Sequence, residues 1–213
     1  MIKKVIHQIW IGDQSKRPDE MMQTWKDKHP DWDYQIWTEE NIPRLVCQKQ
    51  FDQMPELNGK ADILRFELLL EYGGVYIDAD AICLNRLDDF FLDNDAFCCW
   101  ENEIVRPGLM STGYVGASQN NELMRALVQT ISHLDLVGQD QGPAWKVVGP
   151  LLLTKTVEQL NYRRIKIYPS FYFIPRHYTG MEYTGQSKIY ADQLWATTRA
   201  NSRPHYVPPD EIP

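Results

Sequence analysis

The chain has 213 residues, of which 43% are hydrophobic and 12% aromatic, and its formal net charge is −7. This size and apolar content are enough for one domain with a sizeable core, and the acidic balance argues against a nucleic-acid partner, which requires a basic surface. No stretch approaches the roughly 20 apolar residues of a membrane-spanning helix, and the apolar run at the start is too short for a signal peptide.

The four cysteines show no spacing typical of a metal site, and two of them are adjacent in an apolar run; they are Cys47, Cys83, Cys98 and Cys99. We expect reduced core thiols. This favours a reducing compartment and therefore a cytoplasmic protein.

Strands and helices are predicted to alternate. In chain order we expect a strand over 5–11, a helix over 18–28, a strand over 34–37, a helix from Glu39 capped by Thr38, a helix over 60–72, and strands over 75–77, 96–100 and 114–117, followed by helices over 121–134 and 151–160 and a strand over 165–168. This order predicts an α/β fold with a mixed, mostly parallel sheet flanked by helices. We expect one domain over residues 1–200 and a proline-rich tail or linker over 201–213, as in a piece excised from a longer polypeptide.

The strand predicted over 75–77 ends on two carboxylates, Asp78 and Asp80. Because side chains alternate along an extended chain, both point to the same face as Tyr76, whereas Ala79 points toward the core. Neighbouring carboxylates repel unless a cation or proton compensates, and hard divalent cations such as Mg²⁺ or Mn²⁺ suit oxygen ligands. An isolated Asp-x-Asp is also common as a turn or cap at a strand end, so the motif needs independent support.

Asp62 and Arg65 supply part of that support. They lie three residues apart on a helix whose apolar residues cover most of its circumference, which predicts burial. Charges on a buried helix are costly unless they are paired or used by a ligand, and an intrahelical ion pair is the simpler interpretation. However, the turn at Gly73 and Gly74 brings the following strand back alongside, so these two residues can meet the two carboxylates in one cavity. Such a group suits sugar hydroxyls and phosphate oxygens.

Trp10 stands at the end of the first predicted strand. Ligands of open α/β sheets bind at the carboxyl ends of the strands. Trp10 is therefore either an aromatic wall for a nucleotide base or a core tryptophan.

Three segments in this order resemble glycosyltransferase family 32, the DXD sugar-binding group that includes initiation-specific α-1,6-mannosyltransferases. They are HQIWIG at 7–12, ADILR at 61–65 and YGGVYIDAD at 72–80. The same segments are similar to the catalytic core of clostridial glucosylating toxins. The likeness is strongest over residues 1–90 and looser through 148–150 and 168–173. In overall length and likeness the chain also resembles the N-terminal glycosyltransferase domain of a chlorella-virus capsid-glycan protein. That resemblance implies the host cytoplasm as the location.

The resemblance implies a single nucleotide-binding domain of the GT-A type. It further implies metal-dependent, retaining transfer of a hexose or deoxyhexose from a nucleotide-diphospho-sugar, with UDP favoured, to a glycan or glycoprotein acceptor, with a viral capsid glycan as one form. It leaves the nucleophile open: front-face attack needs none, whereas double displacement needs a carboxylate.

The resemblance also implies residue roles. Asp80, with Asp78 directly or through water, would hold Mn²⁺ or Mg²⁺ on the donor diphosphate, and Asp62 and Arg65 would hold the donor sugar; these four form the expected catalytic set. The other expected contacts to the nucleotide-sugar are Ile9, Trp10, Ile11, Tyr76, Ala79 and Trp195.

The chain departs from the family pattern near its C-terminal end. Relatives often carry a His where this chain has Gln193, so Gln193, Asp192 or Thr197 takes that role or the alignment fails there. His177 is the second candidate for a third metal contact. Trp195 is expected either to cover the phosphates as a flap or to pack as a structural residue.

Three alternatives from other classes fit less well. A haloacid-dehalogenase-like phosphotransferase has Asp-x-Asp after a strand, but it needs Thr or Val where Ile82 stands and the motif near the N-terminus. A non-catalytic, cation-dependent sugar-binding module does not account for Asp62 and Arg65 on a buried helix. A sugar nucleotidyltransferase needs a glycine-rich loop after the first strand, where this chain has Gly12-Asp-Gln-Ser.

Overall fold

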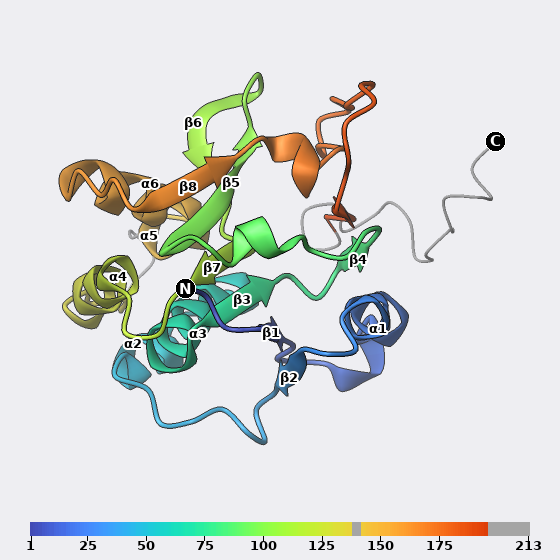
Figure 1. Cartoon of the computed structure of the whole chain (residues 1–213). Coiled ribbons are helices and arrows are strands. Elements are labelled where there is room, and N and C mark those ends of the chain that lie inside the picture. Colours follow the sequence, from blue (N-terminus) through green and yellow to red (C-terminus); the bar gives the residue numbers. More distant parts are fainter. Residues whose placement is uncertain (138–141, 196–213) are drawn as a thin grey trace.

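The computed structural model describes residues 1–137 and 142–195. The predicted tail at 201–213 and the end of the predicted 1–200 domain lie outside the described residues. A seven-stranded sheet forms the centre, with the strand order β2-β1-β3-β7-β5-β6, and β8 pairs with β5 as well (Figure 1).

The elements occur in the following places. The strands of the main sheet are β1 Val5–Ile9, β2 Asp33–Trp37, β3 Gly74–Ile77, β5 Ala96–Asn102, β6 Arg106–Met110, β7 Tyr114–Ala117 and β8 Ile165–Tyr168, and a two-stranded sheet pairs β4 Ala81–Cys83 with β9 Ala191–Gln193. The helices are α1 Asp19–Lys28, α2 Gln48–Gln53, α3 Leu57–Tyr72, α4 Glu122–Ser132, α5 Ala144–Val147 and α6 Pro150–Gln159. Over the two described ranges, no helix combines the length and the apolarity that crossing a bilayer requires.

The sheet is mixed, and most of its strands share one direction. β1 is parallel to β2 and β3, and β8 is parallel to β5. β7 lies between β3 and β5 and is antiparallel to both, while β6 is antiparallel to β5. The carboxyl ends of β1, β2, β3, β5 and β8 therefore lie at one edge of the sheet. This arrangement confirms the predicted mixed, mostly parallel sheet flanked by helices.

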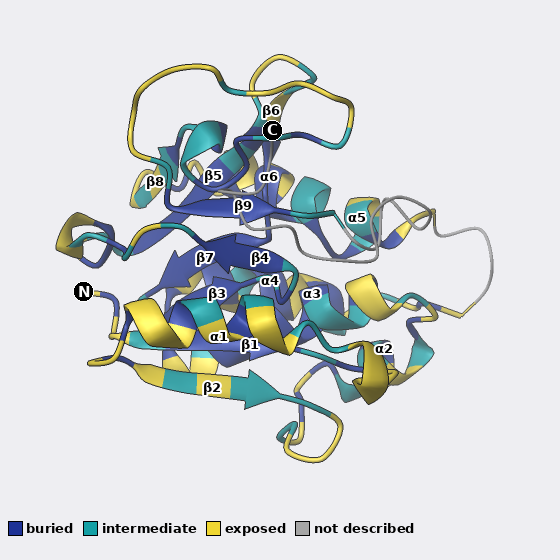
Figure 2. Ribbon diagram, turned by 90° about the vertical axis from the view of Figure 1, so that its right-hand side faces the viewer, coloured by how far each residue is buried: buried dark blue, intermediate teal, exposed yellow. Residues whose placement is uncertain are grey.

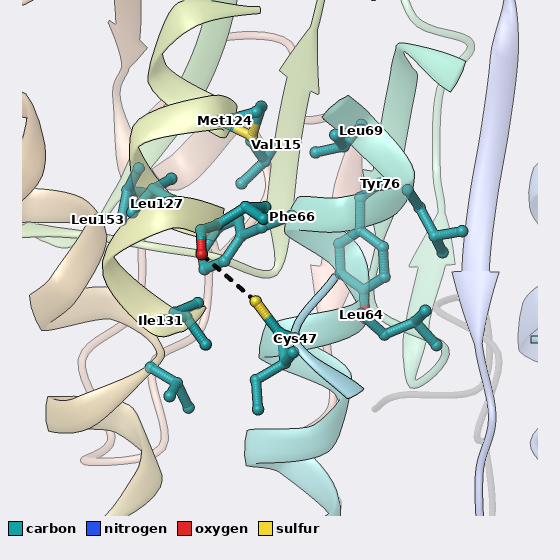
Figure 3. Close-up of a cluster of buried hydrophobic side chains, with 14 of the residues drawn as sticks. Cys47, Leu64, Phe66, Leu69, Tyr76, Val115, Met124, Leu127, Ile131 and Leu153 are labelled. Atoms are coloured by element: carbon teal, nitrogen blue, oxygen red, sulfur yellow. Dashed lines mark hydrogen bonds between the residues drawn. The ribbon is translucent and has the colours of Figure 1, made fainter. Parts of the chain in front are cut away.

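Each face of the sheet has its own hydrophobic core. On one face α3, α4 and α6 cover the strands, and Figure 3 shows Phe66 of α3 beside Leu127 of α4. The Cys47 thiol donates to the Val128 carbonyl across this cluster at 3.3 Å. On the other face, α1 and the β4/β9 sheet cover a second cluster that includes Trp25 (Figure 2). Burial on both faces explains why the strands read as continuous apolar runs.

The helix predicted from Glu39 is wrong. Residues 39–41 form a turn, and the next helix, α2, begins at Gln48. The Asn41 side chain accepts a hydrogen bond from the Thr38 amide at 2.7 Å and donates to the Ile36 carbonyl at 2.8 Å. These side-chain bonds compete with helix formation, and Pro43 disfavours a helical conformation in the residue before it.

The turn between α3 and β3 sets the position of the carboxylate strand. Gly73 ends α3 with φ +66°. Gly74 follows at φ +103°, and a Cβ there would lie 2.7 Å from the Val5 carbonyl oxygen. The turn therefore requires glycine for two reasons, because L side chains disfavour positive φ and because β1 passes too close for a methyl group.

Gly74→Ala should lower the free energy of unfolding much more than Gly108→Ala does. Gly108 also has a positive φ, +78°, but a Cβ there meets nothing within 4 Å. The control therefore carries only the conformational cost of about 1–2 kcal/mol, whereas Gly74→Ala adds a backbone clash. Urea denaturation of both variants measures the difference, and equal losses would show that the approach of β1 is not tight.

Candidate active site

The predicted carboxylate pair lies at the carboxyl edge of the sheet. Asp78 follows β3 directly, and its amide donates to the Gly113 carbonyl at 2.9 Å, so the β3–β7 ladder holds its backbone. Asp80 precedes β4, whose first residue, Ala81, pairs with Gln193 of β9. The ends of β3 and β9 thus meet at this motif.

Gln193 connects the two carboxylates. Its Nε2 donates to Asp80 Oδ1 at 2.7 Å and to Asp78 Oδ2 at 3.5 Å. Its Oε1 accepts a hydrogen bond from the Tyr114 hydroxyl at 2.7 Å. Tyr76, on the strand before the motif, donates its hydroxyl to Asp78 Oδ1 at 2.9 Å. Two of the sequence-predicted residues, Tyr76 and Gln193, therefore contact the pair.

Arg65 joins the motif to the buried helix. Its guanidinium lies 3.3 Å from Asp62 Oδ1 and 3.3 Å from Asp78 Oδ1, and its side chain is only 5% exposed. It also donates to the Thr112 carbonyl, and its Cζ lies 4.2 Å from the centre of the Tyr76 ring. The intrahelical ion pair and the convergence of the four charged residues are thus both present in one network.

Asp62 is the most deeply placed carboxylate of this network. Burial raises the pKa of Asp62 from its usual 3.8 to about 6, although Arg65 and the Thr112 hydroxyl, which donates to it at 3.0 Å, act in the opposite direction. A proton or a ligand's hydroxyl donor therefore stabilises this group.

Two glycines give the carboxylates room. A Cβ on Gly149 would lie 2.5 Å from Asp62 Oδ2, and one on Gly113 would lie 2.6 Å from Asp78 Oδ2. Thr112 and Gly113 belong to the β6–β7 connection and Tyr114 begins β7, and the sequence reasoning did not identify these three as site residues. The short polar run Ser111-Thr112-Gly113 between two strands was the available signal.

The residues predicted to line the nucleotide site divide into core and surface. Ile9, Ile11 and Ala79 are buried. Trp10 is partly exposed at the end of β1, and its indole nitrogen donates to the Asp13 carbonyl at 3.0 Å. A ligand can therefore reach Trp10, and its role as an aromatic wall for a nucleotide base stays a prediction.

The C-terminal residues predicted to contact the metal or the phosphates have different surroundings. Trp195 donates its indole N–H to the Arg176 carbonyl at 3.0 Å, and its ring lies 5.1 Å from that of His177. His177 is buried, with Nε2 3.4 Å from Glu101 Oε1. Asp192 pairs with Arg176. Thr197 lies outside the described residues. Gln193 is therefore the C-terminal candidate with a hydrogen bond to each carboxylate.

The donor set suits a hard cation with an incomplete protein shell. Within the described ranges, no group of three or more His, Cys, Asp or Glu residues could hold a metal. Asp78 and Asp80 supply carboxylate oxygens, and the Gln193 amide would supply its oxygen after a flip that exchanges its two ends. Mg²⁺ or Mn²⁺ commonly completes such a shell with water and phosphate oxygens. The Gln193 amino group now lies against both carboxylates, where a positive charge is favoured. The residues therefore fit the predicted metal.

The ionisation of Asp62 should make stability fall with rising pH. The folded state holds this proton up to a pH of about 6, whereas the unfolded chain releases it near 3.8, so its contribution is complete below pH 3.8 and is lost as the pH rises through 6. The difference in pKa corresponds to roughly 3 kcal/mol. Urea denaturation between pH 3.5 and 7 should show wild type losing stability relative to Asp62→Asn, and a difference that does not change with pH would contradict this assignment.

Comparison with known sequences finds a family match over the part of the chain that holds Asp62, Arg65, Asp78 and Asp80. Residues 15–98 match the family described as the glycosyltransferase sugar-binding region containing the DXD motif. Inositol phosphoceramide mannosyltransferase 3 of Schizosaccharomyces pombe is 33% identical over 41% of this chain and 26% of its own length. The initiation-specific alpha-1,6-mannosyltransferase of Candida albicans is 24% identical over 68% of this chain and 46% of its own length. The chain thus matches a quarter to a half of the length of these relatives.

Solved glycosyltransferases share the fold. The PaToxG glycosyltransferase aligns with a TM-score of 0.60 at 16% identity, covering 75% of this chain and 70% of that one. The UDP-bound glycosyltransferase domain of the YGT toxin gives 0.55 at 11% identity over 78% and 79%. A glycosyltransferase involved in glycosylation of the PBCV-1 major capsid gives 0.54 at 12% identity over 92% and 94%. Residues 15–98, which include Asp78 and Asp80, therefore match the DXD sugar-binding region of the glycosyltransferases, and the chain has the GT-A type fold of the solved enzymes.

Proposed function

We propose that this protein is a metal-dependent, retaining glycosyltransferase that moves a hexose or deoxyhexose from a UDP-sugar to a glycan or glycoprotein acceptor. The observation that carries the proposal is the continuous network from Asp62 through Arg65 and Asp78 to Gln193 and Asp80. It joins groups suited to a sugar with groups suited to a metal diphosphate. A nucleotide-sugar requires both within one binding site.

The sugar end of the network is Asp62 with Arg65. A buried carboxylate with a raised pKa gains most from hydrogen-bond donors, and sugar hydroxyls supply them. Arg65 is held by two carboxylates and by the Tyr76 ring. Its fixed guanidinium can orient a sugar hydroxyl or a phosphate oxygen without a large loss of side-chain entropy.

The diphosphate end is Asp80 with Asp78. Mn²⁺ or Mg²⁺ bound there would act as a Lewis acid that neutralises charge developing on the leaving nucleoside diphosphate. Asp78 Oδ1 already accepts from Tyr76 and Arg65, so Asp80 is the better direct ligand, and Asp78 binds directly or through water. Gln193 can present either end of its amide, because the Tyr114 hydroxyl serves as donor or acceptor.

The relatives support the choice of donor and acceptor. The UDP-bound toxin domain supports UDP as the nucleotide, and the relatives named as mannosyltransferases make mannose a candidate sugar. The capsid glycosyltransferase, aligned along nearly its whole length, supports a viral capsid glycan as one form of the acceptor. A cytoplasmic site of action is also part of the proposal, because all four cysteines are free and buried, and burial raises the pKa of Cys47 and Cys83 to about 12.

Nucleotide binding should depend on Mn²⁺ and on Asp80. Thermal unfolding is measured with UDP, GDP, ADP and dTDP, each with and without Mn²⁺, for wild type, Asp80→Asn and the exposed control Asp93→Asn. Ligand at a hundred times its Kd adds about 2.7 kcal/mol, or a rise in Tm of roughly 5–10 °C for a chain of this size. We expect the largest rise with UDP and Mn²⁺ in wild type and in the control, and its loss in Asp80→Asn. No metal-dependent rise with any nucleotide in wild type would refute the proposal.

A further inference from the structure

A group of partly exposed aromatic rings surrounds a cation farther along the same sheet edge. We define it as the Arg106 cluster, which consists of Glu101, Arg106, Trp145, His177, Tyr178 and Trp195. Glu101 is near the end of β5, and Arg106 begins the antiparallel strand β6 opposite Asn102. The cluster therefore stands at the carboxyl end of β5, as Asp78 stands at the carboxyl end of β3.

Arg106 holds the exposed part of the cluster together. Its Nη2 donates to the Tyr178 hydroxyl at 2.7 Å, and its Cζ lies 5.0 Å from the centre of the Trp145 ring. The Arg106 side chain is 33% exposed, and both rings are also partly exposed. A ligand can therefore reach the rings and the guanidinium from solvent.

Buried charge beneath the rings fixes this arrangement. Glu101 Oε1 lies 3.6 Å from Arg106 Nε and 3.4 Å from His177 Nε2. His177 Nδ1 lies 2.8 Å from the Thr179 hydroxyl. The buried Glu101 carboxylate thus contacts both Arg106 and His177, and it balances the positive charge of Arg106.

Both ends of the cluster adjoin the nucleotide-sugar network. Trp195 follows Gln193 by two residues, and its ring lies 5.1 Å from that of Tyr178. At the other end, Gly149 lies against the Trp145 backbone and against Asp62 Oδ2. The cluster therefore begins where Asp62 and Gln193 of the network end, so a ligand bound in it would lie next to the proposed site of the donor sugar.

Trp195 has a backbone conformation that a bulky residue rarely adopts. Its φ is +59°, and such strain persists only where the surroundings enforce it. Its indole bond to Arg176 and its ring contacts with His177 and Tyr178 do so here. The fold thus keeps this ring at the boundary between the network and the cluster.

We propose that the Arg106 cluster is the acceptor subsite and that it binds a neutral hexose residue of a glycan; this rests on the proposed function. The C–H face of a pyranose ring packs on aromatic rings such as Trp145 and Tyr178, while Arg106 donates hydrogen bonds to hydroxyls. A phosphate or uronate would gain less, because Glu101 already neutralises Arg106. The cluster therefore selects for sugar shape and hydroxyls over negative charge.

Saturation-transfer NMR tests the subsite. The probes are methyl α-mannopyranoside, methyl β-glucopyranoside and methyl β-galactopyranoside, with mannose 6-phosphate as the anionic comparison, each with and without UDP and Mg²⁺, because paramagnetic Mn²⁺ would broaden the ligand signals. The variants are Trp145→Ala, Tyr178→Ala and Arg106→Gln, and Phe90→Ala is the control at an exposed aromatic outside the cluster. The Mn²⁺-dependent rise in Tm with UDP is recorded for every variant.

We expect saturation transfer to at least one neutral hexoside in wild type and in Phe90→Ala. In the cluster variants its affinity should fall about fivefold or more, while the UDP response stays at the wild-type level. The proposal is overturned if no neutral hexoside binds wild type, if only mannose 6-phosphate binds, or if the three variants bind hexosides as wild type does. Hexoside binding without a UDP response would instead refute the proposed nucleotide-sugar donor and leave the subsite standing.

Discussion

A single buried guanidinium, that of Arg65, keeps the carboxylates of α3 and β3 together. Asp62 and Asp78 come from different elements, and without a cation between them they would repel one another in a medium that screens charge weakly. Removing one partner of such a group leaves an uncompensated buried charge, which typically costs 3–5 kcal/mol. The stability of this part of the fold and the proposed binding of a nucleotide-sugar therefore rest on the same side chain.

The antiparallel strand β7 divides the carboxyl edge of the sheet between the proposed donor site and the proposed acceptor subsite. β7 enters the sheet between β3 and β5, so the residues just before it cross the edge at the middle. Thr112 contacts Asp62, and Tyr114, the first residue of β7, donates to the Gln193 amide beside Asp78 and Asp80. The β1–β3 side then carries the proposed donor site, and the β5 side carries the proposed acceptor subsite. A reversal of strand direction thus separates the two halves of the site.

The sequence predicted best what depends on neighbours in the chain. Helix α3, its glycine stop and β3 form one continuous segment, so the meeting of Asp62, Arg65 and Asp78 followed from helical spacing and strand alternation. The helix expected from Glu39 failed because side-chain bonds of Asn41 competed with it. Local sequence patterns could not predict contacts between residues far apart in the chain. The resemblance identified Gln193 as a candidate, but its hydrogen bond to Tyr114 spans 79 residues and was not predicted. The short strands β4 and β9 pair with each other across a long stretch of chain, so neither could be predicted from its own residues.

The pairing of β4 with β9 also determines when the candidate site becomes complete during synthesis of the protein. Gln193 is made 115 residues after Asp78, which at common translation rates is a delay on the order of ten seconds. Throughout that interval the nascent chain holds the two carboxylates without the amide that joins them, and without Trp195. The site is therefore assembled late in translation, and a ribosome-bound chain that stops before β9 lacks one wall of it.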